Sequence, residues 1–180
     1  MFKEVELVNA FRLLHPRFTV LITSEFGGKK GVMAASWITP VSRKPAIIAV
    51  SISPKRETFK LIVNSGYFAL NILDLDFLEN VNKAGTISAR EVKDKFLEVK
   101  LTPIPGKLIK TPVIKEARAV LECEVWKTVE AGDHILFLGE VISAYADESF
   151  NKEWNIDKFR PILHVGGTKY TTCREETYEI

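Results

Sequence analysis

Two long runs of β-forming residues, 118–129 and 134–146, are separated by only four residues with the sequence Glu-Ala-Gly-Asp. Both runs are rich in branched apolar and aromatic residues, which favour extended backbone. A glycine in so short a connection provides the backbone freedom that a tight turn needs. The sequence therefore predicts one long antiparallel hairpin, which commits a large part of the chain to a β fold.

Further β-type runs and a few short helical segments surround this hairpin. The runs lie at 18–24, 31–37, 47–52, 67–73 and 162–165, and the adjacent Gly27 and Gly28 predict a turn between the first two. Short helices are predicted at 57–64, ended by Gly66, and from a capping-box-like start at Asp76 to near Gly85. Residues 86–117 contain three prolines and are predicted to form an extended excursion over the surface.

Because these helices do not alternate regularly with the strands, a doubly wound sheet is disfavoured. We expect a mainly β fold with short helices, in which a closed or nearly closed antiparallel barrel removes the sheet edges. The 180 residues suit a single domain that covers 1–180.

Composition excludes several classes of protein. Lys plus Arg is 25 and Asp plus Glu is 23, so a net charge of +2 gives no general attraction to nucleic acid or to an anionic membrane. The longest apolar runs are far shorter than a membrane span, and the charged N-terminus differs from a signal peptide, so we expect a cytoplasmic protein. Cys123 and Cys173 are far apart, which disfavours a metal site, and Cys123 is interpreted as a packed strand thiol.

The clearest candidate for a binding site is the segment 51–58, where a buried strand ends and a helix begins. It gathers Ser51, Ser53, Lys55, Arg56 and Thr58. A helix N-terminus offers unpaired N–H groups and about half a positive charge, so basic and hydroxyl side chains there form a local anion site. The alternative is that Ser53 only caps a helix whose first turn carries exposed basic residues.

Two other segments could complete a site for a flat ligand. Small residues beside one indole, in the order Met33, Ala34, Ala35, Ser36, Trp37, suit a planar ring that lies against backbone, or equally a strand packed closely on a neighbour. His134 begins a strand after the turn and could hydrogen-bond a cofactor or position a donor ring. Alternatively, it is a turn histidine tied to Asp133.

Taken in order, these segments resemble the flavin reductase-like family. The resemblance rests on Pro-Arg at 16–17, Met-Ala-Ala-Ser-Trp at 33–37, Ser-Ile-Ser-Pro-Lys-Arg-Glu-Thr at 51–58, Gly-Tyr-Phe-Ala-Leu-Asn at 66–71, Gly-Asp-His at 132–134 and Gly-Glu-Val at 139–141. Each motif alone is weak, but together they span the chain from about residue 10 to about residue 170. That family has an FMN-binding split β-barrel, a Greek-key antiparallel barrel.

The resemblance implies a homodimer that binds FMN noncovalently near the subunit interface and transfers a hydride from NADH or NADPH to the flavin. It implies that His134 lies near the flavin and the nicotinamide and is catalytic. The implied cofactor-binding residues are Met33, Ala34, Ala35, Ser36, Trp37, Ser51, Ser53, Lys55, Arg56, Thr58, Asn71 and Lys83. A flavin carries its own redox chemistry, so no Ser/His/Asp triad or pair of carboxylates is required of the protein.

Three functions remain open at this point. The first is an NAD(P)H-dependent reductase that passes electrons to a small acceptor such as free flavin or a ferric complex. The second is a flavoredoxin-like electron carrier with a protein partner and little NAD(P)H turnover. The third is a barrel that binds a phosphorylated ligand without catalysis. The absence of a Gly-x-Gly-x-x-Gly fingerprint after a strand argues against a Rossmann site for the nicotinamide cofactor.

Overall fold

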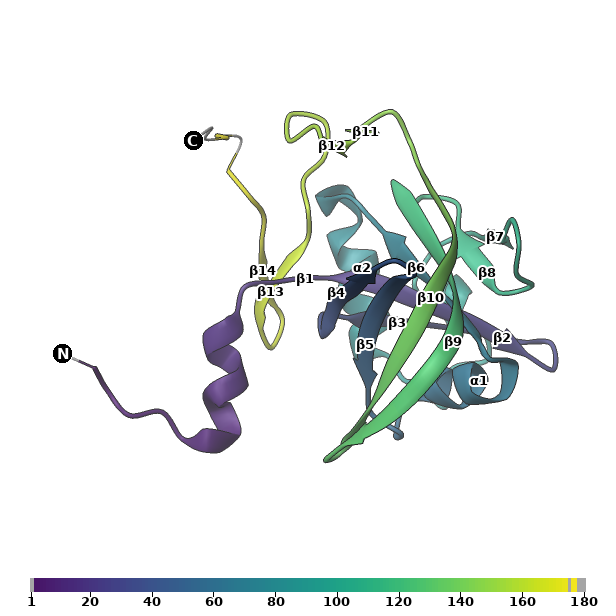
Figure 1. Cartoon of the computed structure of the whole chain (residues 1–180), viewed down its shortest axis with the longest axis horizontal. Helices are drawn as coiled ribbons and strands as arrows, with labels where there is room; N and C mark the ends of the chain where they lie inside the picture. The colour runs from purple at the N-terminus through teal and green to yellow at the C-terminus, as the bar shows by residue number, and fades with distance from the viewer. Residues whose placement is uncertain (1, 175, 178–180) are drawn as a thin grey trace.

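The centre of the molecule is one curved antiparallel sheet (Figure 1). Within residues 2–174, 176 and 177, which the computed structural model describes, seven strands form this sheet in the order β3-β2-β6-β9-β10-β5-β4. Their bounds are β2 (Val20–Phe26), β3 (Lys29–Ala35), β4 (Ile38–Arg43), β5 (Ala46–Ile52), β6 (Tyr67–Ile72), β9 (Ala119–Ala131) and β10 (His134–Ala146). The predicted long hairpin is confirmed, because β9 and β10 pair from His134 opposite Ala131 to Ala146 opposite Ala119.

Short strands and helices outside the seven-stranded sheet complete the fold. The short strands are β1 (Arg17–Phe18), β7 (Pro103–Pro105), β8 (Pro112–Ile114), β11 (Phe150–Asn151), β12 (Glu153–Trp154), β13 (Leu163–Gly166) and β14 (Lys169–Thr171). The helices are η1 (Leu7–Leu14), α1 (Glu57–Ser65), η2 (Leu75–Phe77), α2 (Leu78–Thr86) and α3 (Lys95–Glu98). Figure 1 shows η1 standing away from the sheet beside the β13–β14 hairpin. Within the described part of the chain, no helix has the length and apolar character that a membrane crossing requires.

The mainly β, antiparallel architecture with short helices is confirmed. The two outermost strands of the sheet, β3 and β4, are joined by only Ser36 and Trp37, so the sheet curves back to its own edge. The Ser51 N–H at the end of β5 donates to the carbonyl of Trp37 at 2.9 Å and ties a third strand to this connection. Three strand ends therefore meet at one point of the barrel rim.

Strand β2 is buried on both faces, which explains its continuous apolar run. Val20 and Ile22 belong to one core cluster, while Leu21 between them belongs to another. Ile22 and Leu21 are fully buried, and burying one such side chain contributes about 1.5–3 kcal/mol. This two-sided packing fixes β3 beside β2 and so holds the rim in place.

The thiol and the carboxyl group of two neighbouring residues on β9 are both fully buried. Cys123 is a packed strand thiol, as predicted, and burial first, then the nearby Glu122 carboxylate, raises the pKa of Cys123 to about 12. Burial acts to raise the pKa of Glu122 as well, but N–H groups of Leu108, Lys107 and Ile109 donate to its carboxylate and hold that pKa below its usual value. Glu122 thereby ties the loop at 107–109 to the sheet.

Two predictions about the middle of the chain are wrong. Residues 86–117 are not only a surface excursion, because Phe96, Val99 and Ile114 are buried and complete the second core cluster. The second helix does not start from Asp76. Asp74 instead caps the short η2 by accepting the Asp76 N–H at 3.1 Å, and α2 begins two residues later. The buried Asp74 carboxylate also binds Arg160, a contact that local sequence does not reveal.

Candidate functional site

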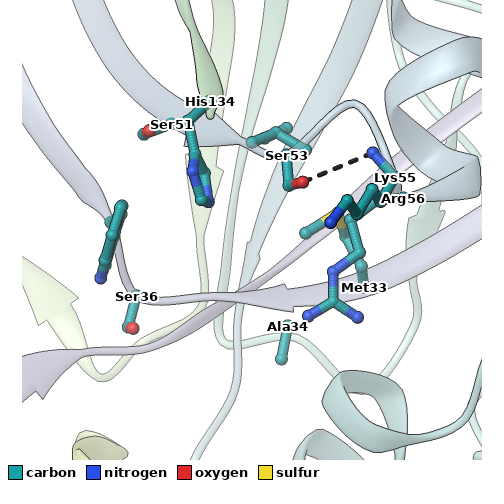
Figure 2. A pocket seen from close by; sticks show the side chains of 10 residues that line it. Met33, Ala34, Ser36, Ser51, Ser53, Lys55, Arg56 and His134 are labelled. Carbon is teal, nitrogen blue, oxygen red and sulfur yellow. Dashed lines mark hydrogen bonds between the residues drawn. The ribbon is translucent and has the colours of Figure 1, made fainter. Parts of the chain in front are cut away.

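A cavity of about 390 Å³ opens where the three strand ends meet at the barrel rim. Its lining includes most of the predicted site residues, namely Met33, Ala34, Ser36, Trp37, Ser51, Ser53, Lys55, Arg56 and His134, together with Ile52. These come from the end of β3, the 36–37 connection, the end of β5, the loop before α1 and the first residue of β10. The three segments that the sequence singled out separately are thus brought together around one space (Figure 2).

One end of the cavity is basic. The N-cap of α1 is Arg56 itself, and no side chain caps the helix, so the first-turn N–H groups keep their partial positive charge. Ser53 does not cap α1; its hydroxyl instead accepts the N–H of Lys55 at 3.4 Å, as the dashed line in Figure 2 shows. The Arg56 guanidinium extends toward Ala34 of β3 in the same view. The geometry favours the anion-site interpretation over simple capping by Ser53.

The acidic residue that follows Arg56 in the sequence, Glu57, already has two cationic partners. The Glu57 carboxylate lies 2.9 Å from Lys60 Nζ and 2.6 Å from Arg90 Nε, and these hydrogen bonds, that from Lys60 first, lower the pKa of Glu57. Arg90 also donates to the Lys55 carbonyl at 3.2 Å. Neither Lys55 nor Arg56 forms a salt bridge with any residue that the structure describes. Their charges remain available for a bound anion.

Lys95 is a further candidate that the sequence analysis missed. Its ammonium group, on α3, donates to the Ala84 carbonyl at 2.7 Å, and the residue is only 8% exposed. Burial, and to a smaller extent the charge of Arg56, lowers the pKa of Lys95 to about 8. Ala84 precedes Gly85, where an added Cβ would lie 3.3 Å from the Cβ of Ala34 in the cavity wall. A buried cation beside another cation, without a carboxylate partner in the described chain, marks a place where an anion would be stabilised.

The other end of the cavity is aromatic. The Trp37 and His134 ring centroids are 4.8 Å apart, and Phe11 of η1 packs edge-on against Trp37 at 5.4 Å. His134 Nδ1 lies 2.7 Å from the Asp133 carboxylate, and this hydrogen bond lowers the pKa of Asp133. Among the described residues, Nε2 of His134 has no partner. Both earlier interpretations therefore hold in part: the histidine is tied to Asp133 and also lines the cavity.

Four predicted residues do not line the cavity. They are Ala35, Thr58, Asn71 and Lys83. Ala35 is buried in the core cluster that contains Val20 and Ile22. Thr58 is a buried residue of α1, and its hydroxyl oxygen would lie 3.0 Å from a Cβ added at Gly31. Lys83 is half-buried on α2, the helix that packs on β3 through Gly85.

The side chain of Asn71 forms its hydrogen bonds with other residues of the protein interior. Its side-chain amide donates to the Leu21 carbonyl at 3.1 Å and to the Thr23 hydroxyl at 3.0 Å, while its oxygen accepts the Ile114 N–H at 2.7 Å. The residue is fully buried. Its hydrogen-bonding capacity is used inside the protein, so its contacts differ from the cofactor contact that the resemblance implies.

The arrangement can bind a long, polar-ended molecule with a flat ring. Cations and helix N–H groups gather at one end, and small side chains gather at the other with the rings of Trp37 and His134, which are tilted by 32° to each other. No group of three His, Cys, Asp or Glu side chains that could hold a metal ion occurs among residues 2–174, 176 and 177. A molecule bound in this cavity would be oriented by the two contrasting ends.

Comparisons with known proteins identify the family. The model of the flavin reductase like domain matches residues 11–172. A ferric-chelate reductase (NAD(P)H) of Archaeoglobus fulgidus is 31% identical over 125 residues, which are 69% of this chain and 72% of that one. An uncharacterized protein of Aeropyrum pernix is 38% identical over 159 residues, 88% of this chain, and the match spans 60% of the length of that relative.

A solved structure has the same fold. It is an FMN-binding domain of a flavin reductase-like enzyme from Shewanella baltica, which superimposes with a TM-score of 0.82 at 26% identity over 98% of this chain and 96% of that one. The family model and the superposition agree with the antiparallel barrel. The chain belongs to the flavin reductase-like family.

Proposed function

We propose that this protein is an FMN-binding flavoprotein reductase that takes a hydride from NADH or NADPH and passes electrons to a small acceptor, such as free flavin or a ferric complex. The observation that carries the proposal is the contrast between the two ends of the cavity. Lys55 and Arg56, which have no salt-bridge partner among the described residues, lie at the start of α1, and small and aromatic side chains lie at the other end. Names of relatives, including a ferric-chelate reductase and an FMN-binding domain, support the same assignment.

The basic end fits the phosphate of FMN. Arg56, Lys55 and the first-turn N–H groups of α1 would donate to its oxygens. Lys95 does not line the cavity, but it is close enough to Arg56 for that charge to affect its pKa, and it would add positive charge behind this end. Each hydrogen bond to a charged group contributes about 1.5–3 kcal/mol. Two or three of them supply a large part of the ~8 kcal/mol that corresponds to micromolar affinity.

The aromatic end fits the ring. Ala34 and Ser36 have no bulk that would obstruct a planar system, and Trp37 closes one side of the space. FMN, when bound, supplies a ring that accepts a hydride. This chain would contribute orientation: His134, held by Asp133, presents Nε2 toward the cavity as a hydrogen-bonding group for a ring or a nicotinamide amide.

An absorbance spectrum of the purified protein, before and after anaerobic NADH or NADPH, tests the proposal. A reductase shows flavin bands, at once or after incubation with FMN, and stoichiometric NADH or NADPH bleaches them without a partner protein. Re-oxidation by a ferric chelate under anaerobic conditions would support the small acceptor. Bound flavin that only a protein donor bleaches would indicate the flavoredoxin-like carrier instead. A protein that stays colourless in excess FMN would contradict the proposal.

We also propose that the protein works as a homodimer. The helix η1 has no buried residue, and its apolar side chains Leu7, Val8, Leu13 and Leu14 are between 67% and 91% exposed. Such a segment gains free energy when a second copy covers it. Light scattering on a size-exclusion column should give twice the 20.3 kDa of one chain. A monomer at micromolar concentration would contradict this.

A further inference from the structure

The short helix η1 turns its aromatic residue toward the body of the protein. None of the residues of η1 is buried, and Figure 1 shows the helix standing away from the sheet. Phe11 is nevertheless only 37% exposed, whereas the apolar side chains of Leu7, Val8, Leu13 and Leu14 are between 67% and 91% exposed. Phe11 is therefore the apolar side chain through which η1 contacts the rest of the fold.

The residue that Phe11 meets is Trp37, which lines the candidate cavity. The two ring centroids are 5.4 Å apart, and the ring planes make an angle of 63°. Such an edge-on aromatic pair is a directional contact. The same indole also lies near the His134 ring, at 4.8 Å. Within the described chain the indole N–H has no hydrogen-bond partner, so packing against neighbouring side chains sets the orientation of this ring.

The helix is held beside the β13–β14 hairpin by its C-cap residue, His15. His15 Nδ1 lies 2.9 Å from the Val165 carbonyl of β13, and because a carbonyl only accepts, Nδ1 carries the proton and donates it. The His15 ring is 5.2 Å from that of His164 and 6.0 Å from that of Phe11. A chain of contacts therefore runs from this hairpin through His15 and Phe11 to Trp37 at the cavity.

We propose that Phe11 is a positioning residue, which holds the indole of Trp37 at the ring end of the cavity and so makes η1 part of the flavin site. The proposal rests on the proposed FMN site. Phe11 itself does not line the cavity, so it acts through Trp37. The ring end would receive the flavin ring whether or not a phosphate is attached. Loss of the Phe11 contact should therefore affect FMN and riboflavin, which lacks the phosphate, to the same extent.

Equilibrium titration of the flavin-free protein with FMN and with riboflavin, followed by flavin fluorescence, tests this proposal. Phe11→Ala should raise the Kd for both flavins about five-fold, as expected for the loss of one aromatic pair. Phe11→Tyr keeps the ring and should bind both flavins as wild type does. Lys55→Ala, at the basic end, should raise the Kd for FMN alone. Because η1 has no buried residue, Phe11→Ala should leave the free energy of unfolding unchanged.

A double-mutant cycle shows whether Phe11 acts through the indole. In a Trp37→Ala background, Phe11→Ala should cause no further change in either Kd, because the contact is already lost. The absorbance spectrum of bound flavin reports the surroundings of its ring and provides a second measurement. This spectrum should change in Phe11→Ala and in Trp37→Ala but not in Lys55→Ala, a pattern that a loss of stability alone would not produce.

Phe2→Ala is the matched control, because it removes the same side chain from a fully exposed position and should leave both affinities unchanged. The proposal is overturned if Phe11→Ala binds both flavins like wild type, or if its effect persists undiminished in the Trp37→Ala background. A lower mass of Phe11→Ala than of wild type in light scattering would also overturn it, since loss of assembly would then explain the weaker binding. If wild type binds neither flavin, the proposed FMN function itself fails, which the same titration shows separately.

Discussion

Lys95 offers a test in which the stability of the flavin-free protein and its affinity for FMN should move in opposite directions. Burial and the neighbouring Arg56 lower the pKa of Lys95 from 10.5 to about 8. Lowering a pKa by one corresponds to about 1.4 kcal/mol, so the charged ammonium costs the folded, flavin-free protein roughly 3 kcal/mol. Lys95→Met removes this cost and loses one hydrogen bond, to the Ala84 carbonyl, worth about 1 kcal/mol. We expect a net gain of about 1–2 kcal/mol in the free energy of unfolding at pH 7.

The sign of the pH dependence follows from the same pKa. Below pH 8 both the folded and the unfolded state carry the charge, so the full cost is present. Between pH 8 and pH 10.5 the folded state releases the proton first, and the cost disappears as pH rises. The stability advantage of Lys95→Met over wild type should therefore decline across this interval.

The affinity for FMN should respond in the opposite sense. Lys95 does not line the cavity, so its charge would act on the phosphate through space, and its loss should weaken FMN binding roughly ten-fold or less. Riboflavin, which lacks the phosphate, should bind wild type and variant equally. FMN affinity of wild type should fall as pH rises above about 8, where the free protein loses the Lys95 charge, and this fall should be absent from the variant.

Urea unfolding and fluorescence titration with both flavins provide the measurements, and the exposed neighbour Lys93→Met is the control. If Lys95 is only a structural residue, Lys95→Met should lower the free energy of unfolding and should weaken the binding of FMN and of riboflavin by the same factor. That result, or unchanged FMN affinity, would refute the reasoning.

Three further substitutions probe other parts of the structure. His134→Ala should slow single-turnover bleaching by NADH or NADPH more than it raises the Kd for FMN, and an unaltered bleaching rate would refute its role. Asn71→Ala leaves the buried Ile114 N–H unpaired, so the free energy of unfolding should drop by about 2–3 kcal/mol in a urea titration, with intact FMN binding once folded. Gly139→Ala would place a Cβ 2.4 Å from the fully buried Phe68 ring, and we expect a loss of about 1–3 kcal/mol by the same titration; equal stability would show that the ring can move.

The sequence predicted those parts of the fold that depend on local pattern. The β9–β10 hairpin follows from two long β-type runs around Gly132, and α1 ends at Gly66, which has the left-handed φ of 75° that the glycine cap requires. The cavity residues were found for the same reason, since each group is a short contiguous segment at a strand end. Their meeting point at Trp37 depends on how the strands are ordered and how the sheet curves, which the local pattern of each segment does not specify.

Residues whose roles depend on distant partners were missed or misjudged. Lys95 lies in a segment that the prolines made look like a surface excursion, and its significance arises from Ala84 and Arg56, neither of which is near it in sequence. Asn71 lies within the predicted strand 67–73, and sequence alone does not show that its side-chain oxygen accepts the Ile114 N–H of β8. Tertiary hydrogen bonds of this kind leave no local signature.

Because the thiol of Cys123 is buried, the native protein should be labelled selectively at its other cysteine. The reactive form of cysteine is the thiolate, and a pKa of about 12 inside the sheet keeps that form scarce at neutral pH. Cys173, the other of the two cysteines, is exposed near the end of the described chain. A maleimide dye or a spin label should therefore attach at one position without any engineering, and the appearance of a second reactive sulfur would report the opening of the sheet itself.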